Sequence, residues 1–388
     1  MAGDTESFET VDWSETGGRL STLSRRDRGA LVAGLALVAA FVFDYAVRPP
    51  DRPTIATPVE WNVTQLDWLF VTTLLALCLY VVVPLYENRR LTAYYWREFR
   101  KNRMAVIGLG YLLVVFLVGT VGPLFLEKPD LAVRQAYQPP VFLGVDASVP
   151  VDCLGPVVEG RCRGTMAHPL GTTGEGKDVL VLVVYGMQVS MKVGLISTLL
   201  VVTIGTTVGT VAAYGGGLVD ELLMRYVDVQ LVFPAFFLYL LLTYLFGGSL
   251  FMFIVIFGLT GWGAIARLVR SEALQRAEEA YVTAARGAGA GTLYVIRRHL
   301  VPNVSNSVIT AATLLIPGFI LFEASLSFLS LGDPTVPSWG QVIAAGRSDL
   351  STAWWVSTVP GVFLFTTILA FNFLGDALRD ALDPRQEA

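Results

Sequence analysis

The chain has 388 residues, of which 54% are hydrophobic and only 15% are charged, and its formal net charge is −4. Soluble domains contain about 25% charged residues, so this composition is typical of a polytopic membrane protein rather than of two or three soluble domains. The slightly negative charge argues against a nucleic-acid partner.

The N-terminal part of the chain predicts a disordered segment followed by two membrane helices. Residues 1–24 are polar and acidic and cannot form a core. The apolar run Gly29–Val47 follows a basic group, lacks a cleavage site and is followed directly by two prolines, so we interpret it as a membrane helix and not as a signal peptide. A second apolar run covers about Leu69–Leu85.

The orientation follows from the arginines. The segment Glu87–Arg103 is the most basic part of the chain, so the positive-inside rule places it in the cytoplasm. The second helix therefore leads inward, which places the N-terminus in the cytoplasm as well. A third span, Met104–Leu126, then leads outward.

The rest of the chain predicts five more spans, which gives eight helices with both termini cytoplasmic. They are Val189–Ala213, Val229–Phe246, Leu250–Ala266, Val308–Leu329 and Val356–Leu374. The segments expected outside are 48–66, 127–188 and 331–355, and those expected inside are 87–103, 214–228, 267–304 and 375–388. Gly205 and Gly209 have the spacing of closely packed membrane helices, with a chance pair in a glycine-rich chain as the alternative.

The stretch Glu272–Asn303 lies between apolar runs but is rich in charge, so it must be a loop outside the lipid. Its first half predicts a helix in which Glu272 pairs with Arg276 across one turn. The glycines at 287, 289 and 291 then interrupt the helix.

A second short helix is expected after these glycines, and Pro302 is expected to end it. Leu293, Ile296 and Leu300 would form its apolar face, opposite two arginines. A helix–glycine–helix element with one apolar and one basic face is typical of a docking element, and a solvated loop is the alternative.

This stretch resembles the EAA loop of permease subunits of ATP-binding-cassette (ABC) importers. The family pattern is Glu-Ala-Ala, three residues, Gly, nine residues and Ile-x-Leu-Pro. The residues at these positions are Thr283, Ala284, Ala285, Gly289, His299, Val301 and Pro302. Thr283, His299 and Val301 depart from the pattern. The resemblance implies that the loop, with Leu293, Ile296 and Leu300, is the coupling helix that binds a groove of a cytoplasmic ATPase subunit.

The predicted external segment contains two candidate features. Cys153 and Cys162 are close in sequence and on the side where oxidation is permitted, so they form a disulfide or remain two free thiols. Residues Gly171–Lys177 match the first places of a phosphate-binding loop, but Asp178 stands where that loop needs Ser or Thr. The stretch instead resembles the HPLGTDxxGRDVL signature of dipeptide and oligopeptide permeases, with departures at Thr173 and at Lys177.

Glu323 lies in the middle of a predicted span. An ionisable residue there costs about 3 kcal/mol, and such residues usually face a partner or an aqueous path. We consider Glu323 a candidate for the translocation path, while a hydrogen bond to a neighbouring helix or a protonated carboxyl is the alternative. No catalytic motif or metal-ligand set is evident, and His168 and His299 are expected on opposite sides of the membrane.

Two further stretches, FRKNRMAVIGLGYLLVVFLVG and the tail from Gly375 to Arg385, resemble the C-type subunits of dipeptide and oligopeptide permeases. The resemblance implies an all-α permease with a six-helix core of the type I importer class. The domains expected are the disordered residues 1–24, an extra two-helix extension at 25–95, a first core helix with the external segment at 96–188, the permease domain at 189–378 and a cytoplasmic tail at 379–388.

The same resemblance implies a multi-pass protein of the cell membrane that is not an enzyme. Its expected partners are a related B-type permease subunit, two ATPase subunits that bind ATP, an external solute-binding protein and the lipid bilayer, and no cofactor is expected in this chain. Peptides, nickel chelates and oligosaccharides remain open as substrates. An ion-coupled secondary transporter is the competing hypothesis, and it would show buried charge pairs or broken helices in both halves.

Overall fold

The computed structural model describes residues 25–47 and 63–382, which divide into two units, one up to Arg89 and one from Arg90 onward. The disorder expected at 1–24, most of the first external loop and the last six residues lie outside this described part. Within it, seven helices are long and apolar enough to cross a membrane, or eight if one bent pair counts as a single span. This confirms the all-α polytopic class.

The first unit consists of two apolar helical runs. Its elements are α1 (Arg25–Val42), η2 (Phe43–Val47), α2 (Gln65–Leu77), η3 (Cys78–Val82) and α3 (Val83–Glu87). Thr64 begins the second run, because it and Asp67 cap each other's backbone in a capping box. The Trp68 indole donates a 3.0 Å hydrogen bond to Asp44, which ties the two runs together.

The second unit contains the remaining helices and a small sheet. Its elements are α4 (Arg89–Phe99, which begins at the boundary), α5 (Arg103–Phe125), η4 (Val133–Gln135), β1 (Gly144–Asp146), β2 (Val157–Val158), β3 (Arg161–Arg163), α6 (Val179–Gly215), α7 (Gly217–Val232), α8 (Ala235–Phe246), α9 (Leu250–Thr260), α10 (Gly263–Ala277), α11 (Ala280–Gly287), α12 (Thr292–Val295), η5 (Ile296–Leu300), α13 (Val301–Phe328), α14 (Trp339–Ala345), η6 (Arg347–Asp349) and α15 (Trp355–Leu382).

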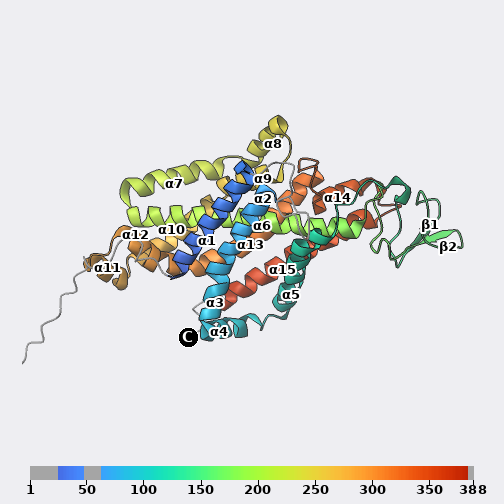
Figure 1. The fold of residues 1–388 in the computed structure, drawn as a ribbon. Helices are drawn as coiled ribbons and strands as arrows, with labels where there is room; N and C mark the ends of the chain where they lie inside the picture. The colour runs from blue at the N-terminus through green and yellow to red at the C-terminus, as the bar shows by residue number, and fades with distance from the viewer. Residues whose placement is uncertain (1–24, 48–62, 383–388) are drawn as a thin grey trace, which may run out of the picture. The chain divides into compact units, whose positions relative to one another are not determined.

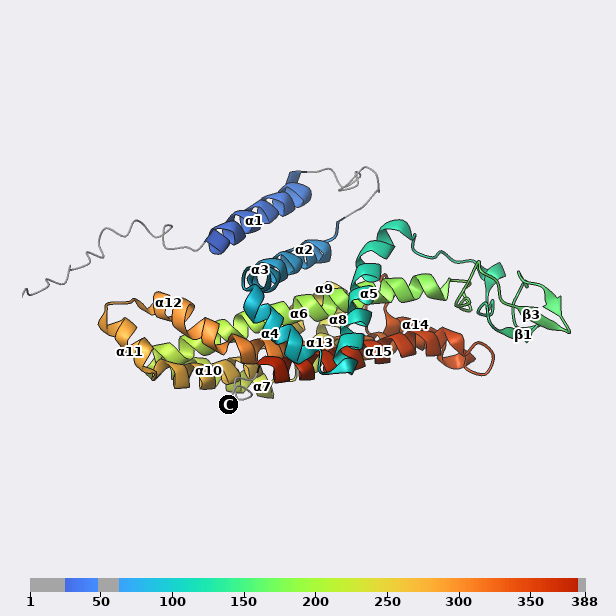
Figure 2. The same cartoon turned by 90° about the horizontal axis from the view of Figure 1, so that it is seen from below.

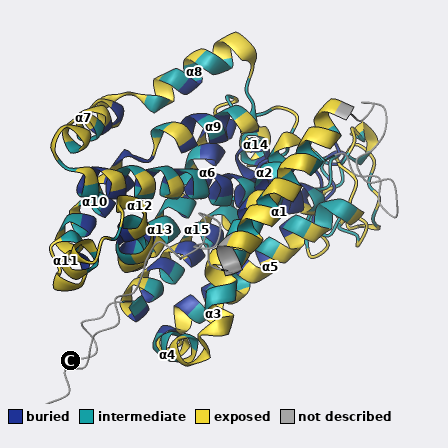
Figure 3. Cartoon of the chain, turned by 60° about the vertical axis from the view of Figure 1, so that its left-hand side comes forward, coloured by how far each residue is buried: buried dark blue, intermediate teal, exposed yellow. Residues whose placement is uncertain are grey.

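Helix α6 is the central element of this unit. It has 37 residues and packs against α5, α9, α10 and α13. It is apolar on nearly all sides, as expected of a helix surrounded by others, and it is largely buried, whereas α7 and α8 are mainly exposed (Figure 3). It begins at Val179, well before the expected start at Val189, because the Asp178 carboxylate accepts the N–H groups of Leu180 and Val181 as an N-cap.

Gly205 and Gly209 allow α6 and α10 to approach closely. A Cβ atom at Gly205 would lie 2.8 Å from Ile265, and one at Gly209 would lie 2.6 Å from the Ala266 carbonyl oxygen. Both distances are too short for a real contact, so the spacing of the two glycines marks a true helix contact and not a chance pair. Buried residues Val201, Val269 and Val304 continue this core onto α13.

Two helices differ from the expected spans. The expected span Val229–Phe246 contains α8 and only the last turn of α7, and these two helices form a bent pair with an angle of 66°. The bend lies at Phe233–Pro234, where the proline offers no N–H to continue the helix. By contrast, α12, η5 and α13 form one helix from Thr292 to Phe328, so Pro302 does not end the preceding helix.

The expected external segment and the expected docking loop lie at opposite ends of α6 (Figures 1 and 2). The end with the expected external segment carries a three-stranded antiparallel sheet of order β1-β3-β2, which the all-α prediction did not include. Opposite ends of one membrane-length helix are where two segments on different sides of a bilayer must lie.

Candidate functional site

The docking loop folds around its own small apolar core. Val282, Val295 and Leu300 are fully buried and pack together, and Ala277 at the end of α10 and Tyr214 at the end of α6 pack against them. The Arg286 guanidinium lies 4.4 Å from the centre of the Tyr214 ring, which adds a cation–π contact. The loop therefore has a defined shape, held by its own side chains.

Gly289 makes the turn between α11 and α12. Its φ is +83°, and the N–H groups of Gly289 and Ala290 donate to the carbonyl oxygens of Arg286 and Ala285 at 2.9 and 3.0 Å. A Cβ atom added at Gly289 would meet nothing within 4 Å. The requirement for glycine is therefore conformational, because L-residues rarely adopt a positive φ.

The predicted apolar face Leu293, Ile296 and Leu300 is wrong as a single surface. The Leu293 side chain is 76% exposed, whereas Leu300 is fully buried and Ile296 packs beside it. The cause is local: residues Ile296–Leu300 form a π-helical turn, which shifts the angular positions after it relative to an ordinary α-helix. Leu293 can reach a partner, while Leu300 supports the loop from inside.

Pro302 lies inside the continuous helix from Thr292 to Phe328, directly after the π-helical turn, in which the Val301 N–H bonds to the Ile296 carbonyl oxygen. A π-helical turn changes which carbonyl oxygens the following residues face, and such a local adjustment lets a helix accommodate a proline. Instead of forming the predicted pair with Glu272, the Arg276 guanidinium lies 3.8 Å from the Glu279 carboxylate.

The other residues of the EAA-like pattern lie on or near the surface of this loop. Thr283 and Ala284 are exposed, Ala285 and Val301 are half-buried, and the His299 ring lies between the rings of Tyr281 and Tyr294. The small side chains of Ala284 and Ala285 leave the surface of α11 open to close approach.

Two ion pairs fasten α10 to α7, and the sequence did not predict them. Arg270 donates two hydrogen bonds of 2.5 Å to Asp220, and Arg267 pairs with Asp228. The first pair is the bidentate kind, which is the stronger geometry. The signal was present as two aspartates spaced along α7 and two arginines one turn apart on α10, but their partnership needs the fold.

Glu323 is buried with 5% exposure, and it accepts a 2.6 Å hydrogen bond from the Ser327 hydroxyl one turn away on α13. The Ser338 side chain, at the start of the neighbouring α14, interacts with the same carboxyl. Ser327 in turn lines a cavity at the end of the unit that is expected outside the membrane. Glu323 thus lies one residue away from space that solvent can enter.

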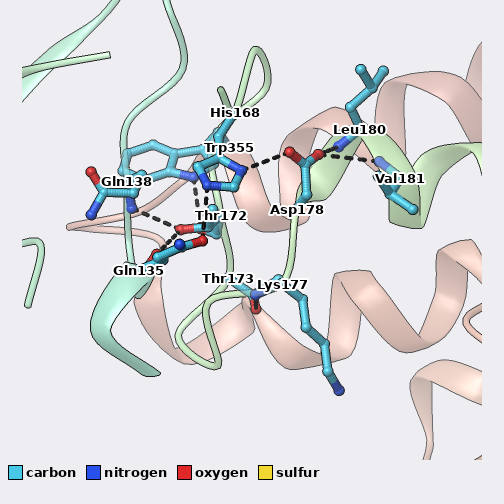
Figure 4. Close-up of polar contacts among 10 residues, drawn as sticks. All are labelled: Gln135, Gln138, His168, Thr172, Thr173, Lys177, Asp178, Leu180, Val181 and Trp355. Carbon is cyan, nitrogen blue, oxygen red and sulfur yellow. Dashed lines mark hydrogen bonds and ion pairs between the residues drawn. The ribbon is translucent and has the colours of Figure 1, made fainter. Parts of the chain in front are cut away.

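The external segment is fastened to the helices by a hydrogen-bond network (Figure 4). His168 lies 2.7 Å from Asp178 and 3.1 Å from Gln135 through its two ring nitrogens. Thr172 accepts the Gln138 N–H at 2.8 Å, and its carbonyl accepts the Trp355 indole N–H at 3.2 Å. These bonds attach the segment to the N-termini of both α6 and α15.

The same geometry excludes a phosphate-binding loop. Asp178 occupies the N-terminus of α6, where an acid repels phosphate, and Lys177 points away from that network and pairs with Glu175 at 2.6 Å. Cys153 and Cys162 form a disulfide, as one of the two alternatives predicted, and it links the β3 strand to the preceding loop.

A cavity of about 630 Å³ opens where the external segment meets the turn before and after α14. Both positions at which the chain departs from the resembled external signature, Thr173 and Lys177, line it. A second cavity of about 290 Å³ adjoins it and contains Ser327, the hydrogen-bond partner of Glu323.

Two family models match the chain. Residues 205–388 match the binding-protein-dependent transport system inner membrane component, and residues 91–140 match the N-terminal transmembrane domain of oligopeptide transport permease C. The oligopeptide transport permease OppC of Haemophilus influenzae is 35% identical over 300 residues, which is 77% of this chain and 90% of that protein.

Two further relatives agree. The dipeptide transport permease DppC of Bacillus subtilis is 36% identical over 75% of this chain and 84% of its own length. The OppC permease of Escherichia coli is 34% identical over 77% of this chain and 93% of its own length. The chain belongs to the OppC/DppC family of ABC-importer permeases.

This membership decides between the importer permease and the ion-coupled transporter, and it places the permease in a transport family and not in an enzyme family. The docking loop and Glu323 both fall within the matched range 205–388. The disulfide and the external network fall mostly between the two matched ranges. The match to the N-terminal domain of oligopeptide transport permease C begins at residue 91, one residue after the second unit begins.

Proposed function

We propose that this permease forms half of the pore of an importer for short peptides, paired with a related B-type permease subunit. The names of its relatives, oligopeptide and dipeptide permeases, support peptides over nickel chelates and oligosaccharides. An external solute-binding protein delivers the peptide, and both termini of the chain lie in the cytoplasm.

The loop 272–303 carries the coupling to ATP hydrolysis. The observation behind this proposal is its folded shape: α11 and α12 enclose the Val282, Val295 and Leu300 core and present small and basic side chains outward. Two cytoplasmic ATPase subunits bind the ATP, one of them on this loop, and this chain needs no cofactor. Leu293 is the exposed apolar side chain best placed to enter the ATPase groove.

The helices next to the loop give a route for the movement. On one side α10 is fixed to α6 at Gly205 and Gly209 and to α7 by two ion pairs. On the other side a single helix runs from Thr292 through Glu323 to Phe328. A displacement of the loop by the closing ATPases therefore moves α13 as one body, and this opens the pore outward by alternating access with Glu323 beside the path.

Cysteine labelling tests the orientation. Ser348 and Ala288 are exposed at the ends proposed to be external and cytoplasmic. In a Cys78→Ser background, a membrane-impermeant maleimide should modify Ser348→Cys in intact cells and Ala288→Cys only after permeabilisation. Equal modification of both in intact cells would contradict the proposed orientation.

Reconstitution tests the function. The permease pair and the ATPases are placed in proteoliposomes with the solute-binding protein on one side, and uptake of a radiolabelled tripeptide is measured with and without ATP. We expect uptake that requires both ATP and the binding protein. Uptake of a nickel chelate or an oligosaccharide in place of peptide would overturn the proposed substrate class.

A further inference from the structure

We infer that the two adjoining cavities at the external end of the second unit form a subsite for a short peptide with free termini. The inference rests on the proposed function and names where the permease itself would contact its substrate. The cavities measure about 630 and 290 Å³ and share the lining residues Pro334, Gln341 and Ala345. The larger lies within the range of about 300–1,000 Å³ that is usual for ligand sites.

Backbone strain is concentrated at these cavities. Three described residues other than glycine have a positive φ: Tyr137 at +58°, Ser330 at +64° and Glu159 at +53°. Tyr137 lines the larger cavity and Ser330 the smaller one. Ser330 ends α13 as a left-handed cap, with the Leu331 N–H bonded to the Leu326 carbonyl oxygen, which is a common helix ending. Tyr137 follows no such helix end, and residues other than glycine that are held in this conformation gather at ligand-binding sites.

The charges that line the cavities are only partly used within the chain. The Lys128 ammonium makes one long contact of 3.4 Å, to the Thr335 carbonyl oxygen, and its side chain is exposed. Asp349 accepts one 3.0 Å hydrogen bond, from the Tyr137 hydroxyl, which leaves its other oxygen available. Lys177, by contrast, is already paired with Glu175.

These groups match a zwitterion. An ammonium with unused donors binds a carboxylate, and a carboxylate with an unused oxygen binds an ammonium. A peptide carries one of each at its two ends, whatever its side chains are. The apolar lining, which includes Leu182, Pro337 and Val342, would receive side chains without selecting strongly among them. We therefore assign Lys128 to the peptide carboxylate and Asp349 to its amino group.

The test measures binding to the assembled importer without its solute-binding protein and without ATP. Isothermal titration is performed with trialanine, with trialanine amide and with N-acetyl-trialanine. In the unmodified protein each blocked terminus should weaken binding about tenfold or more, the loss expected for one charge-assisted contact. In Lys128→Ala the amide and the free acid should bind alike, and in Asp349→Asn the acetylated and free peptides should bind alike.

Matched controls separate this from a general charge effect. Arg134 and Asp130 are exposed charges of the same external segment that do not line either cavity. Arg134→Ala and Asp130→Asn should keep the full discrimination of both termini. Asp349→Asn keeps an oxygen that can accept the Tyr137 hydroxyl, so the wall of the cavity is preserved.

The results that overturn the inference are specific. They are no binding of trialanine to the unmodified protein at millimolar concentration, or a loss on blocking a terminus that is the same in the variant as in the unmodified protein. Failure of the proposed function is a separate result, since it would appear as no ATP-driven peptide uptake in proteoliposomes. Peptide uptake together with unchanged discrimination in both variants means that only the subsite is wrong.

Discussion

The external segment and the docking loop are held in shape by different numbers of interactions. The external segment is long and irregular, and it is held by a disulfide, a small sheet and a network that connects His168 to Asp178 and Thr172 to Trp355. The docking loop is shorter and is held by one cluster of three buried side chains, by Tyr214 with its cation–π contact to Arg286, and by one glycine turn. Because many interactions hold the external segment, losing one of them should change its shape little. Because few interactions hold the docking loop, a single substitution can change its shape.

Replacing Gly289 by valine should have the largest effect, because it breaks the less supported region. A β-branched residue at a φ of +83° costs about 1–3 kcal/mol of local strain, and no neighbouring atom blocks the side chain itself. The angle between α11 and α12 should change, and Leu293 should then no longer fit the ATPase groove that we propose it enters. We expect a loss of ATP-driven uptake of tenfold or more, with assembly and ATPase binding retained.

Gly287→Val is the matched control for this change. Gly287 ends α11, has no positive φ and also faces open space. The control should lose far less uptake than Gly289→Val. Equal losses would mean that bulk at the partner surface, and not the turn, is what matters, and normal uptake in both variants would mean that the loop does not couple to the ATPases.

The sequence predicts the two regions unequally well, for physical reasons. Hydropathy places the spans, since lipid tolerates only long apolar runs, and the spacing of Gly205 and Gly209 predicts a close contact. Helix ends outside lipid are less certain. Asp178 extends α6 outward by capping it, and Pro302 continues a helix that a proline rule would end. The first outcome depends on a cap at the start of a helix, and the second on the π-helical turn directly before the proline, which the sequence does not reveal.

The candidate site shows the same division. Gly289 could be singled out through its place in the EAA-like pattern, whereas Gly287 and Gly291 also separate the two helices but have no positive φ. The exposure of Leu293 and the burial of Leu300 could not be predicted from sequence, since one π-helical turn changes which side chains point inward. The pairs of Asp220 with Arg270 and of Asp228 with Arg267 join helices about one span apart in sequence, and no local pattern predicts such a pairing.

Removing the disulfide probes the better supported region. Cys153→Ser together with Cys162→Ser releases a short covalent loop, worth about 2–3 kcal/mol in local order. Amide hydrogen exchange around β3 should accelerate, roughly a hundredfold at most, while exchange near Thr172 should change little because its hydrogen bonds remain. Loss of protection across the whole external segment would show that the disulfide, and not the network, holds it.

Thiol counting provides an independent check on the same bond. Under denaturing conditions without reductant, one cysteine, Cys78, should react, since Cys153 and Cys162 are linked. Three reactive cysteines would show that the bond is absent from the protein as purified.

The two ion pairs between α7 and α10 hold the helix that leads into the docking loop, and they should differ in strength. The Asp220–Arg270 side chains are 21% and 32% exposed, whereas both side chains of Asp228–Arg267 are 52% exposed. Coupling energies of about 1 kcal/mol for the first pair and of about 0.5 kcal/mol or less for the second are expected, because water screens exposed charges. Double-mutant cycles on thermal unfolding measure both. A stronger coupling for the exposed pair would contradict this order.

The smallest expected effect is the pH response of Tyr137 in the external segment. Burial, followed by the hydrogen bond and charge of Asp349, raises the pKa of the Tyr137 phenol above its usual 10.0. A raised pKa means that the folded state favours the neutral phenol, so its contribution is complete below pH 10 and is lost as the pH rises through the folded-state pKa. Tyr137→Phe removes this phenol and its hydrogen bond to Asp349, so it serves as the reference protein. The difference between the ultraviolet titrations of the two proteins should show one tyrosine that ionises late, and Asp349→Asn should move that titration to lower pH. An unchanged titration in Asp349→Asn would mean that the charge of Asp349 does not act on the phenol, and the carboxylate would then be too far away to belong to the same cavity wall.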